Sequence, residues 1–187
     1  SSDTYIGFMI MHHYHLVDSW HHMAEGILSG KPVRERSSFS DEEQRESFLM
    51  GMFNIGMATA PKVAQEIDLT ACTRLLDMGG GPGTFAIHFC MANPDLEAVV
   101  FDLETTRPFA EKTISRFSLE DRVKFCPGDF ITDTPRAGEP FDVAWLSHVL
   151  HAEGPDQAKK VIAHAIKALK PGSRIFIHEF ILDNTFD

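Results

Sequence analysis

The stretch Arg74–Thr84 constrains the fold more than any other part of the chain. A short apolar run that includes Leu75, Leu76 and Met78 has the length of a buried strand, and it passes directly into a run of glycines. Glycines supply the positive φ angles and the close backbone approach that a ligand-holding turn requires. The stretch therefore predicts a strand, a glycine turn and a helix that together line a cofactor crevice.

The spacing of these glycines separates the possible cofactors. A dinucleotide fingerprint has the pattern G-x-G-x-x-G and directs backbone amides at a pyrophosphate. Here the pattern begins with Gly79 and Gly81, but its sixth position is Thr84, preceded by Gly83. Asp77 ends the strand, and a carboxylate there repels a pyrophosphate and attracts a cation. S-Adenosylmethionine, which carries a sulfonium and an ammonium but no phosphate, fits this pattern better than NAD.

A second acid supports the same cofactor. The apolar run 98–101 ends in Asp102, followed by Leu103, about twenty residues after the glycines. A carboxylate at this position can accept hydrogen bonds from both hydroxyls of a ribose. Two acids at two strand ends favour a cofactor site over a glycine run that only makes a tight turn.

From Arg74 onward, strand and helix patterns alternate, which predicts an α/β fold with a parallel sheet and helices on both faces. Right-handed crossovers give a Rossmann-like, doubly wound sheet of order 3-2-1-4-5. We expect this domain over residues 71–187, after a helical segment at 1–70 that helps form the substrate pocket. Strands are expected at 75–78, 98–102, 123–126, 141–146 and 174–180, and helices at 83–91, 107–117 and 155–169.

Three helices are expected in the N-terminal segment. Apolar residues at helical spacing predict the first over about 13–29, closed by Gly30. Ser40 and Glu43 form a capping box for the second, and Pro61 starts the third.

The second of these helices carries a stripe of methionine and phenylalanine that includes Phe53 and Met57. Such a stripe suits the core, and it also suits a pocket for a flat aromatic ligand. Five histidines lie at the start of the first helix or within it, and His12 and His15 could begin a metal site. Because no further ligand completes it, we expect solvated or hydrogen-bonded histidines and no metal.

The composition of the chain limits the classes of molecule that it can bind and the cellular compartment in which it works. The formal net charge of −10, without a lysine or arginine cluster, argues against nucleic acid. No apolar run approaches the ~20 residues that cross a bilayer, so no membrane partner is expected. Three cysteines without metal-ligand spacing are typical of a reducing cytoplasm. We expect a cytoplasmic protein that acts on a small molecule.

Polar side chains follow the third, fourth and fifth strands. After the third, Gly128 precedes Asp129, which could accept from an adenine amino group, and Phe130, which could pack on the ring. Ser147 and His148 follow the fourth strand, and we expect Ser147 at the cofactor and His148, which faces the crevice, at the substrate. These ends share one edge of a parallel sheet, where ligands of open α/β folds bind.

The same edge carries a candidate base. His151 follows the fourth strand and Glu179 ends the fifth, and these strands are neighbours in the expected order. An imidazole oriented by a carboxylate is an arrangement used in general-base chemistry.

Together these residues resemble the plant and bacterial small-molecule O-methyltransferases, the family that includes caffeic acid and hydroxyindole O-methyltransferases. The strongest similarity lies at 77–81, 101–103, 128–130 and 149–151. The resemblance implies the class I fold, S-adenosylmethionine and a phenolic or enolic acceptor. It also implies residue roles: His151 as base, Glu179 as its orienting group, Phe53 and Met57 at the acceptor, and Gly79, Asp102, Asp129 and Phe130 at the cofactor.

The chain departs from the family pattern at several points. Ala152 and Glu153 follow His151 where the family has Asp-Trp, and Ser147 replaces a common lysine. The family's N-terminal dimerisation domain and last two strands are also missing. We therefore expect part of a longer protein that forms a homodimer through a domain absent here. Two alternatives remain: a cofactor-binding module without catalysis, and a family member with a non-methylating reaction.

Overall fold

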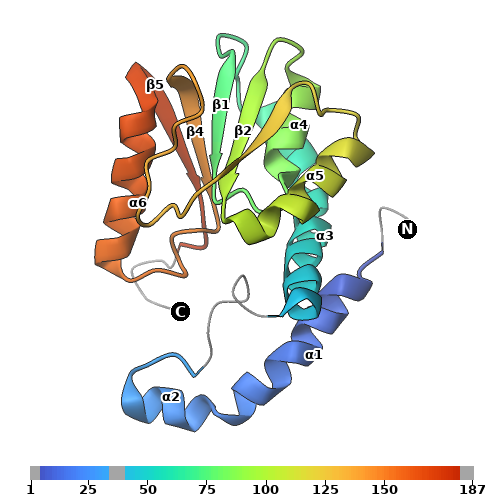
Figure 1. Cartoon of the computed structure of the whole chain (residues 1–187), viewed down its shortest axis with the longest axis vertical. Helices are drawn as coiled ribbons and strands as arrows, with labels where there is room; N and C mark the ends of the chain where they lie inside the picture. The colour runs from blue at the N-terminus through green and yellow to red at the C-terminus, as the bar shows by residue number, and fades with distance from the viewer. Residues whose placement is uncertain (1–4, 34–40, 182–187) are drawn as a thin grey trace. The chain divides into compact units, whose positions relative to one another are not determined.

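The computed structural model describes residues 5–33 and 41–181. The chain divides into two compact units, residues 1–59 and residues 60–187, whose boundary falls inside one long helix. Figure 1 labels most of the helices and strands of the two units. Among the described residues, no helix is long and apolar enough to cross a membrane.

The first unit begins with α1 (Gly7–His21) and α2 (Met23–Ser29), where the sequence predicted one helix from about residue 13. The helix starts earlier than expected and is interrupted at His22. His22 Nδ1 lies 2.8 Å from the carbonyl oxygen of Asp18, the acceptor that a continuous helix offers to the His22 amide. That amide instead donates to Ser19 O. The predicted end is confirmed, because Gly30 has φ +66°.

The next helix, α3 (Glu42–Glu66), runs through Pro61, so the prediction of a separate helix starting at Pro61 was wrong. Ala60 and Ala64, on either side of the proline and one turn apart, are buried. Their packing outweighs the backbone hydrogen bond that proline cannot donate.

Ser40, the predicted N-cap, lies outside the described residues. Asp41 caps the helix, since its Oδ1 accepts from the Gln44 amide at 2.9 Å.

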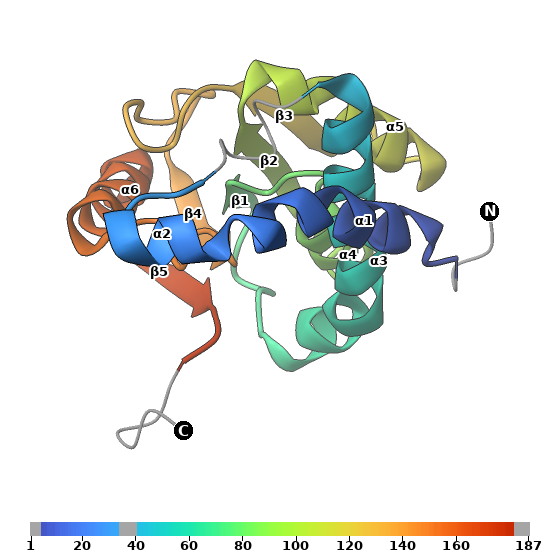
Figure 2. The same ribbon diagram turned by 90° about the horizontal axis from the view of Figure 1, so that it is seen from below.

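The second unit contains the predicted parallel sheet, with the strand order β3-β2-β1-β4-β5. Figure 2 shows the five strands from below. The predicted fold class is therefore confirmed. The strands are β1 (Arg74–Met78), β2 (Glu97–Asp102), β3 (Val123–Pro127), β4 (Phe141–Ser147) and β5 (Leu169–His178). The helices between them are α4 (Thr84–Ala92), the 3-10 turn η2 (Glu104–Thr106), α5 (Arg107–Arg116) and α6 (Pro155–Ala168).

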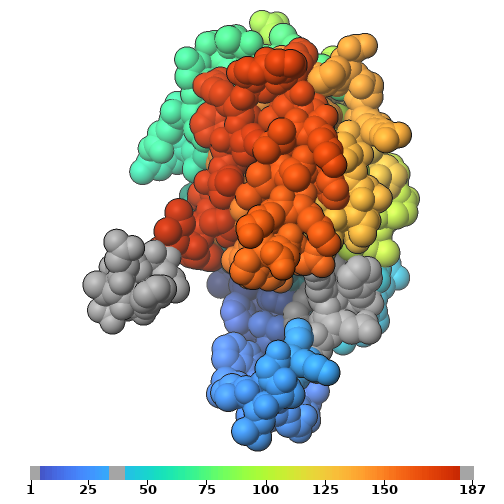
Figure 3. Space-filling model, turned by 90° about the vertical axis from the view of Figure 1, so that its left-hand side faces the viewer, coloured from blue at the N-terminus to red at the C-terminus, as the bar shows by residue number. Residues whose placement is uncertain are grey.

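Helices cover both faces of this sheet (Figure 1). Successive strand residues point to opposite faces, so each strand contributes to two apolar clusters. One cluster joins the strands to α4 and α5, and the other joins them to α6. Figure 3 shows α6 and β5, in orange to red, at the surface of this unit. In the first cluster lie Leu75, Val100 and Val143; in the second lie Leu76, Phe101 and Leu146.

β5 begins at Leu169 and ends at His178, earlier at both ends than the predicted 174–180. Leu169 pairs with Phe141, and a register shift then brings Arg174 opposite Val143. Gly172, with φ +82°, lies in this irregular stretch. The strand therefore includes residues 170–173, which the sequence left between the predicted helix and the predicted strand.

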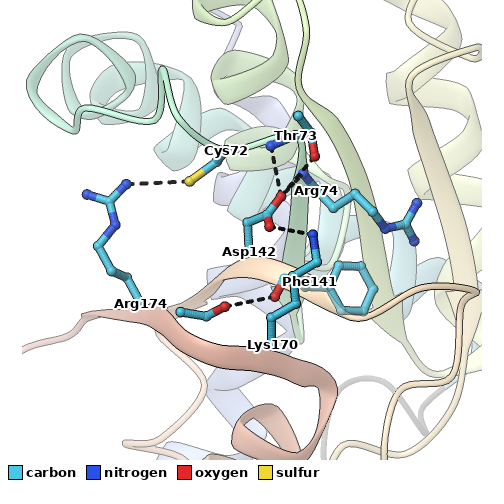
Figure 4. A network of polar contacts seen from close by, with 8 residues as sticks. Cys72, Thr73, Arg74, Phe141, Asp142, Lys170 and Arg174 are labelled. Atoms are coloured by element: carbon cyan, nitrogen blue, oxygen red, sulfur yellow. Dashed lines mark hydrogen bonds and ion pairs between the residues drawn. The ribbon is translucent and has the colours of Figure 1, made fainter.

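The amino ends of β1, β4 and β5 are tied together by Asp142 (Figure 4). Its Oδ2 accepts from the amides of Thr73 and Arg74, each at 2.9 Å, and its Oδ1 accepts from Lys170 Nζ at 2.6 Å. Partial burial acts to raise the pKa of Asp142, but these donors outweigh it and hold the pKa well below its usual range. The carboxylate is therefore a stabilising link at the end of the sheet away from the predicted site.

Candidate functional site

The glycine turn after β1 has the backbone that the sequence predicted. Gly79, Gly81 and Gly83 have φ angles of +68°, +54° and +78°, in the left-handed region that favours glycine. The Gly79 amide donates to Phe101 O of β2 at 2.8 Å. A Cβ on Gly79 would lie only 2.8 Å from Cγ2 of Val149, in the loop after β4. The turn and that loop are therefore in direct contact, and only glycine fits between them.

Asp77 lies beneath this turn. Its side chain is 1% exposed, and Oδ2 accepts from the Ala86 amide at 3.3 Å, in the first turn of α4. Burial raises the pKa of Asp77 to about 7; the charge of Asp102 adds to the rise and the Ala86 hydrogen bond opposes it. The sequence predicted a carboxylate that attracts a cationic ligand. In the structure the buried carboxylate also accepts a hydrogen bond from α4. Any attraction between Asp77 and a cationic ligand is therefore electrostatic and acts at a distance.

Asp102 also holds the turn. Its Oδ2 accepts from the Gly81 amide at 2.8 Å, and its Oδ1 accepts from the Leu103 amide at 2.7 Å and from Thr106 Oγ1 at 3.2 Å. Burial raises the pKa of Asp102, against the effect of these donors. Thr106 was not predicted from the sequence; the signal for it was its position one helical turn after Asp102.

The segment after β3 packs beside the turn. The Gly128 amide donates to Asp102 O at 2.9 Å, and a Cβ on Gly128 would collide with the ring of Phe101. Phe130 packs against the apolar cluster under α6, and its ring lies 3.4 Å from a Cβ built on Gly79. Asp129 Oδ1 accepts from the Ile131 amide at 2.8 Å. Its expected hydrogen bond to an adenine stays a prediction.

At the ends of β4 and β5, polar side chains form a second group. Glu179 is almost buried, with 8% of its side chain exposed, and its Oε2 lies 2.8 Å from His151 Nδ1. Its Oε1 accepts from the Leu150 amide at 2.7 Å. Burial acts to raise the pKa of Glu179, but the hydrogen bonds from His151 and Leu150 outweigh it and the pKa is lowered. An ionised Glu179 that binds Nδ1–H leaves Nε2 of His151 as the basic nitrogen.

Comparison with known proteins identifies the family. Residues 20–187 match the family model of the O-methyltransferase domain. The chain belongs to this family. The resemblance drawn from the glycine turn, the strand-end acids and the His151 loop is thereby confirmed.

Two curated relatives of this O-methyltransferase domain come from Streptomyces. The chain is 28% identical to a 3-hydroxy-5-methyl-1-naphthoate 3-O-methyltransferase of S. sahachiroi, over 97% of this chain and 54% of that protein. It is 32% identical to the tetracenomycin polyketide synthesis 8-O-methyl transferase TcmO of S. glaucescens, over 88% of this chain and 49% of that protein. The chain thus spans about half the length of the curated relatives it matches.

Solved structures agree on the fold. An O-methyltransferase family protein from Burkholderia thailandensis superposes with a TM-score of 0.85 at 30% identity, over 96% of this chain and 55% of that one. Human N-acetylserotonin methyltransferase, solved in complex with SAM, gives a TM-score of 0.83 at 23% identity, over 99% of this chain and 55% of that one. The latter likeness concerns the fold alone.

His148 occupies a special position in the O-methyltransferase domain. It adopts φ +53°, and its amide donates to His178 O at 2.9 Å. Its Nδ1 lies 3.7 Å from Glu179 Oε2, is buried, and has no hydrogen-bond partner among the residues that the structure describes. Burial lowers the pKa of His148, helped by His178 and His151 and opposed by Glu179. The sequence placed His148 at the crevice, and the structure adds its closeness to Glu179.

His178 is a neighbour of these residues that was not predicted at the site. Its Nδ1 lies 2.9 Å from Ser147 Oγ, and its ring stacks on Trp145 with centroids 5.5 Å apart. Ser147, predicted at the cofactor, therefore contacts the end of β5. Successive residues of a strand point to opposite faces, so His178 points to the face of the sheet opposite that of Ile177. This alternation along β5 was the signal that could have identified His178.

The two acceptor residues predicted on the second helix lie in the first unit. Phe53 is buried, with 3% of its surface exposed, and Met57 is half-buried. Within that unit Phe53 belongs to the core. A role for Phe53 and Met57 toward the acceptor remains a prediction.

Proposed function

We propose that this chain is the cofactor-binding and catalytic part of an S-adenosylmethionine-dependent enzyme that methylates a hydroxyl oxygen of a small aromatic molecule. The contact between Gly79 and Val149 carries the proposal. Through it, the loop that holds the His151–Glu179 pair packs directly on the glycine turn. A base and a cofactor cradle lie side by side on one edge of the sheet.

The residues at the turn suit S-adenosylmethionine. The three glycines give the turn its left-handed backbone, and Asp77 and Asp102 hold the turn and the start of α4 where a phosphate-binding site would place a cation. When bound, the cofactor supplies an activated methyl group on its sulfonium. Asp102 and Leu103 would hold the ribose, and Asp129 and Phe130 the adenine. Gly128 and Ser147 would border the same pocket.

His151 and Glu179 supply the proton transfer. Nε2 of His151 would take the proton of the acceptor hydroxyl while the oxygen attacks. Glu179 fixes the ring through Nδ1 at 2.8 Å and stabilises the imidazolium that forms. A positioned base contributes on the order of 10²–10⁴-fold. A phenol of pKa ~10 is protonated at neutral pH and benefits from such a base, which favours an aromatic hydroxyl as acceptor.

Two assays test this function. Calorimetry of the purified chain should show heat on addition of S-adenosylmethionine or its demethylated product. In the whole protein, transfer of a labelled methyl group to members of a phenol panel should depend on His151. Binding without transfer to any phenol would favour the alternatives, a non-catalytic module or a non-methylating enzyme. No binding by the whole protein would refute the cofactor.

We further propose that the whole protein is a homodimer that works in the cytoplasm on a small-molecule acceptor. The first unit exposes large apolar side chains, among them Tyr14 at 68%, Trp20 at 64% and Leu28 at 89%. A second copy of the protein would cover such a surface, beside the contacts of the dimerisation domain that is expected outside this chain. All three cysteines are free, as suits a reducing compartment. Light scattering of the whole protein should give twice the monomer mass, and a monomer mass would contradict the dimer.

A further inference from the structure

The base of the proposed reaction belongs to a group with the composition of a metal site. His148, His151 and Glu179 each offer a ligand atom, and the three atoms lie within 4.8 Å of one another. Two imidazoles and one carboxylate, with a fourth position open, form a ligand set that zinc uses in catalytic sites. Residues on two neighbouring strand ends converge here, so the group does not depend on a single loop.

The two nitrogen–oxygen distances suit an ion. Both Nδ1 atoms face the same carboxylate oxygen, Glu179 Oε2, at 2.8 Å from His151 and 3.7 Å from His148. Ligands bound at about 2.0–2.1 Å in a tetrahedron lie about 3.3 Å apart, between these two values. His151 is 49% exposed and His148 is 34% exposed, so the rings have room to adjust and the site is open to solvent.

His148 supplies the observation that points to a ligand. Its Nδ1 is buried and, within residues 5–33 and 41–181, has no hydrogen-bond partner, although it faces a carboxylate. A buried polar atom without a partner is costly. A distance of 3.7 Å is too long for a hydrogen bond, but an ion between the two groups would satisfy both. The left-handed φ of +53° at His148 holds the ring in this position at a cost in backbone strain.

We infer that His148, His151 and Glu179 bind a divalent transition-metal ion such as Zn²⁺, and that the bound ion switches off His151 as a base. The second half rests on the proposed function. An imidazole that ligates a metal through Nδ1 carries its proton on Nε2. The nitrogen that must take the acceptor proton is then already protonated. Zinc binding and methyl transfer therefore exclude each other at this site.

The binding half is tested on the chain without cofactor or acceptor. Zn²⁺ is titrated against a chromophoric chelator, and Co²⁺ replaces it as a spectroscopic probe, because its visible bands are strong in four-coordinate sites and weak in the hexa-aqua ion. We expect one tight equivalent with strong cobalt bands. His148→Ala and Glu179→Gln should each weaken it by about 100-fold or more, since even the loss of an outer partner costs 10–100-fold.

His21→Ala is the matched control, because His21 is exposed on α1, in a segment rich in histidine. It should leave the tight equivalent unchanged. If the tight site survives both His148→Ala and Glu179→Gln, the ion is bound elsewhere and the inference is wrong. It is equally wrong if the wild-type chain gives no four-coordinate cobalt spectrum.

The inhibitory half is tested in the whole protein. Zinc should suppress methyl transfer, and a chelator should restore it. Full activity with the site shown to be loaded would overturn this half. The metal titration does not require methyl transfer. A missing metal site is therefore seen in the titration, and a wrong proposed function is seen in the methyl-transfer assay without zinc.

Discussion

Asp77→Asn should make the cofactor-free chain more stable at high pH and should weaken its cofactor binding. The carboxyl group of Asp77 is 1% exposed, and burial raises its pKa from 3.8 to about 7. Between pH 3.8 and about pH 7 the Asp77 carboxyl group is ionised in the unfolded chain and protonated in the folded chain. The Asp77 contribution to stability is therefore full below pH 4 and is lost as the pH rises through about 7.

The magnitude follows from the two pKa values. A rise from 3.8 to about 7 corresponds to about 4 kcal/mol, at about 1.4 kcal/mol for each unit of pKa. An asparagine has nearly the same shape, can still accept from the Ala86 amide, and does not ionise. We expect the variant to match the wild type near pH 4 and to exceed it by roughly 2–4 kcal/mol at pH 8.

Urea unfolding at several pH values between 4 and 8 measures this difference. Asp95→Asn, a substitution of an exposed aspartate, is the control and should show no such growth with pH. Calorimetry at pH 8 should show weaker binding of the cationic cofactor to Asp77→Asn. A stability difference between variant and wild type that stays constant from pH 4 to pH 8 would refute the reasoning.

Other substitutions test separate parts of the site. In the whole protein, His151→Ala should lower kcat and kcat/KM together by about 10²–10⁴-fold and spare cofactor affinity; wild-type turnover would remove His151 from the mechanism. Asp102→Ala should weaken cofactor binding by about 1–3 kcal/mol in calorimetry, because ribose hydroxyls lose a partner; unchanged affinity would contradict its role. Gly79→Ala should lower Tm, because a φ of +68° costs an alanine about 1–2 kcal/mol and its Cβ would be too close to Val149. An unchanged Tm would show that the turn changes its backbone angles without cost. Asp142→Ala should cost about 2–3 kcal/mol in urea unfolding at pH 7. This cost should shrink as the pH falls below the ordinary pKa of 3.8 toward the lowered pKa of the folded chain; a cost that does not change with pH would mean that the charge is irrelevant.

The sequence by itself determined the sheet and which residues meet at the edge where the site is predicted. Strand order followed from alternating strand and helix patterns, because right-handed crossovers leave few arrangements. Glycine spacing predicted the left-handed turn, because only glycine adopts such angles without strain. The pairing of His151 with Glu179 followed from the order of the strands, since the ends of neighbouring parallel strands lie side by side.

Tertiary structure decided the features that depend on packing and on side-chain direction. Pro61 lies inside a helix because buried alanines on both sides hold it there, and no local signal reports that burial. Asp77 turns toward Ala86 of α4, and His148 turns toward Glu179 through a left-handed backbone angle. A sequence pattern places a residue at a strand end but does not set its rotamer or its neighbours, because these depend on contacts between segments far apart in the chain. The ligand set of the proposed metal site became visible only once those contacts were known.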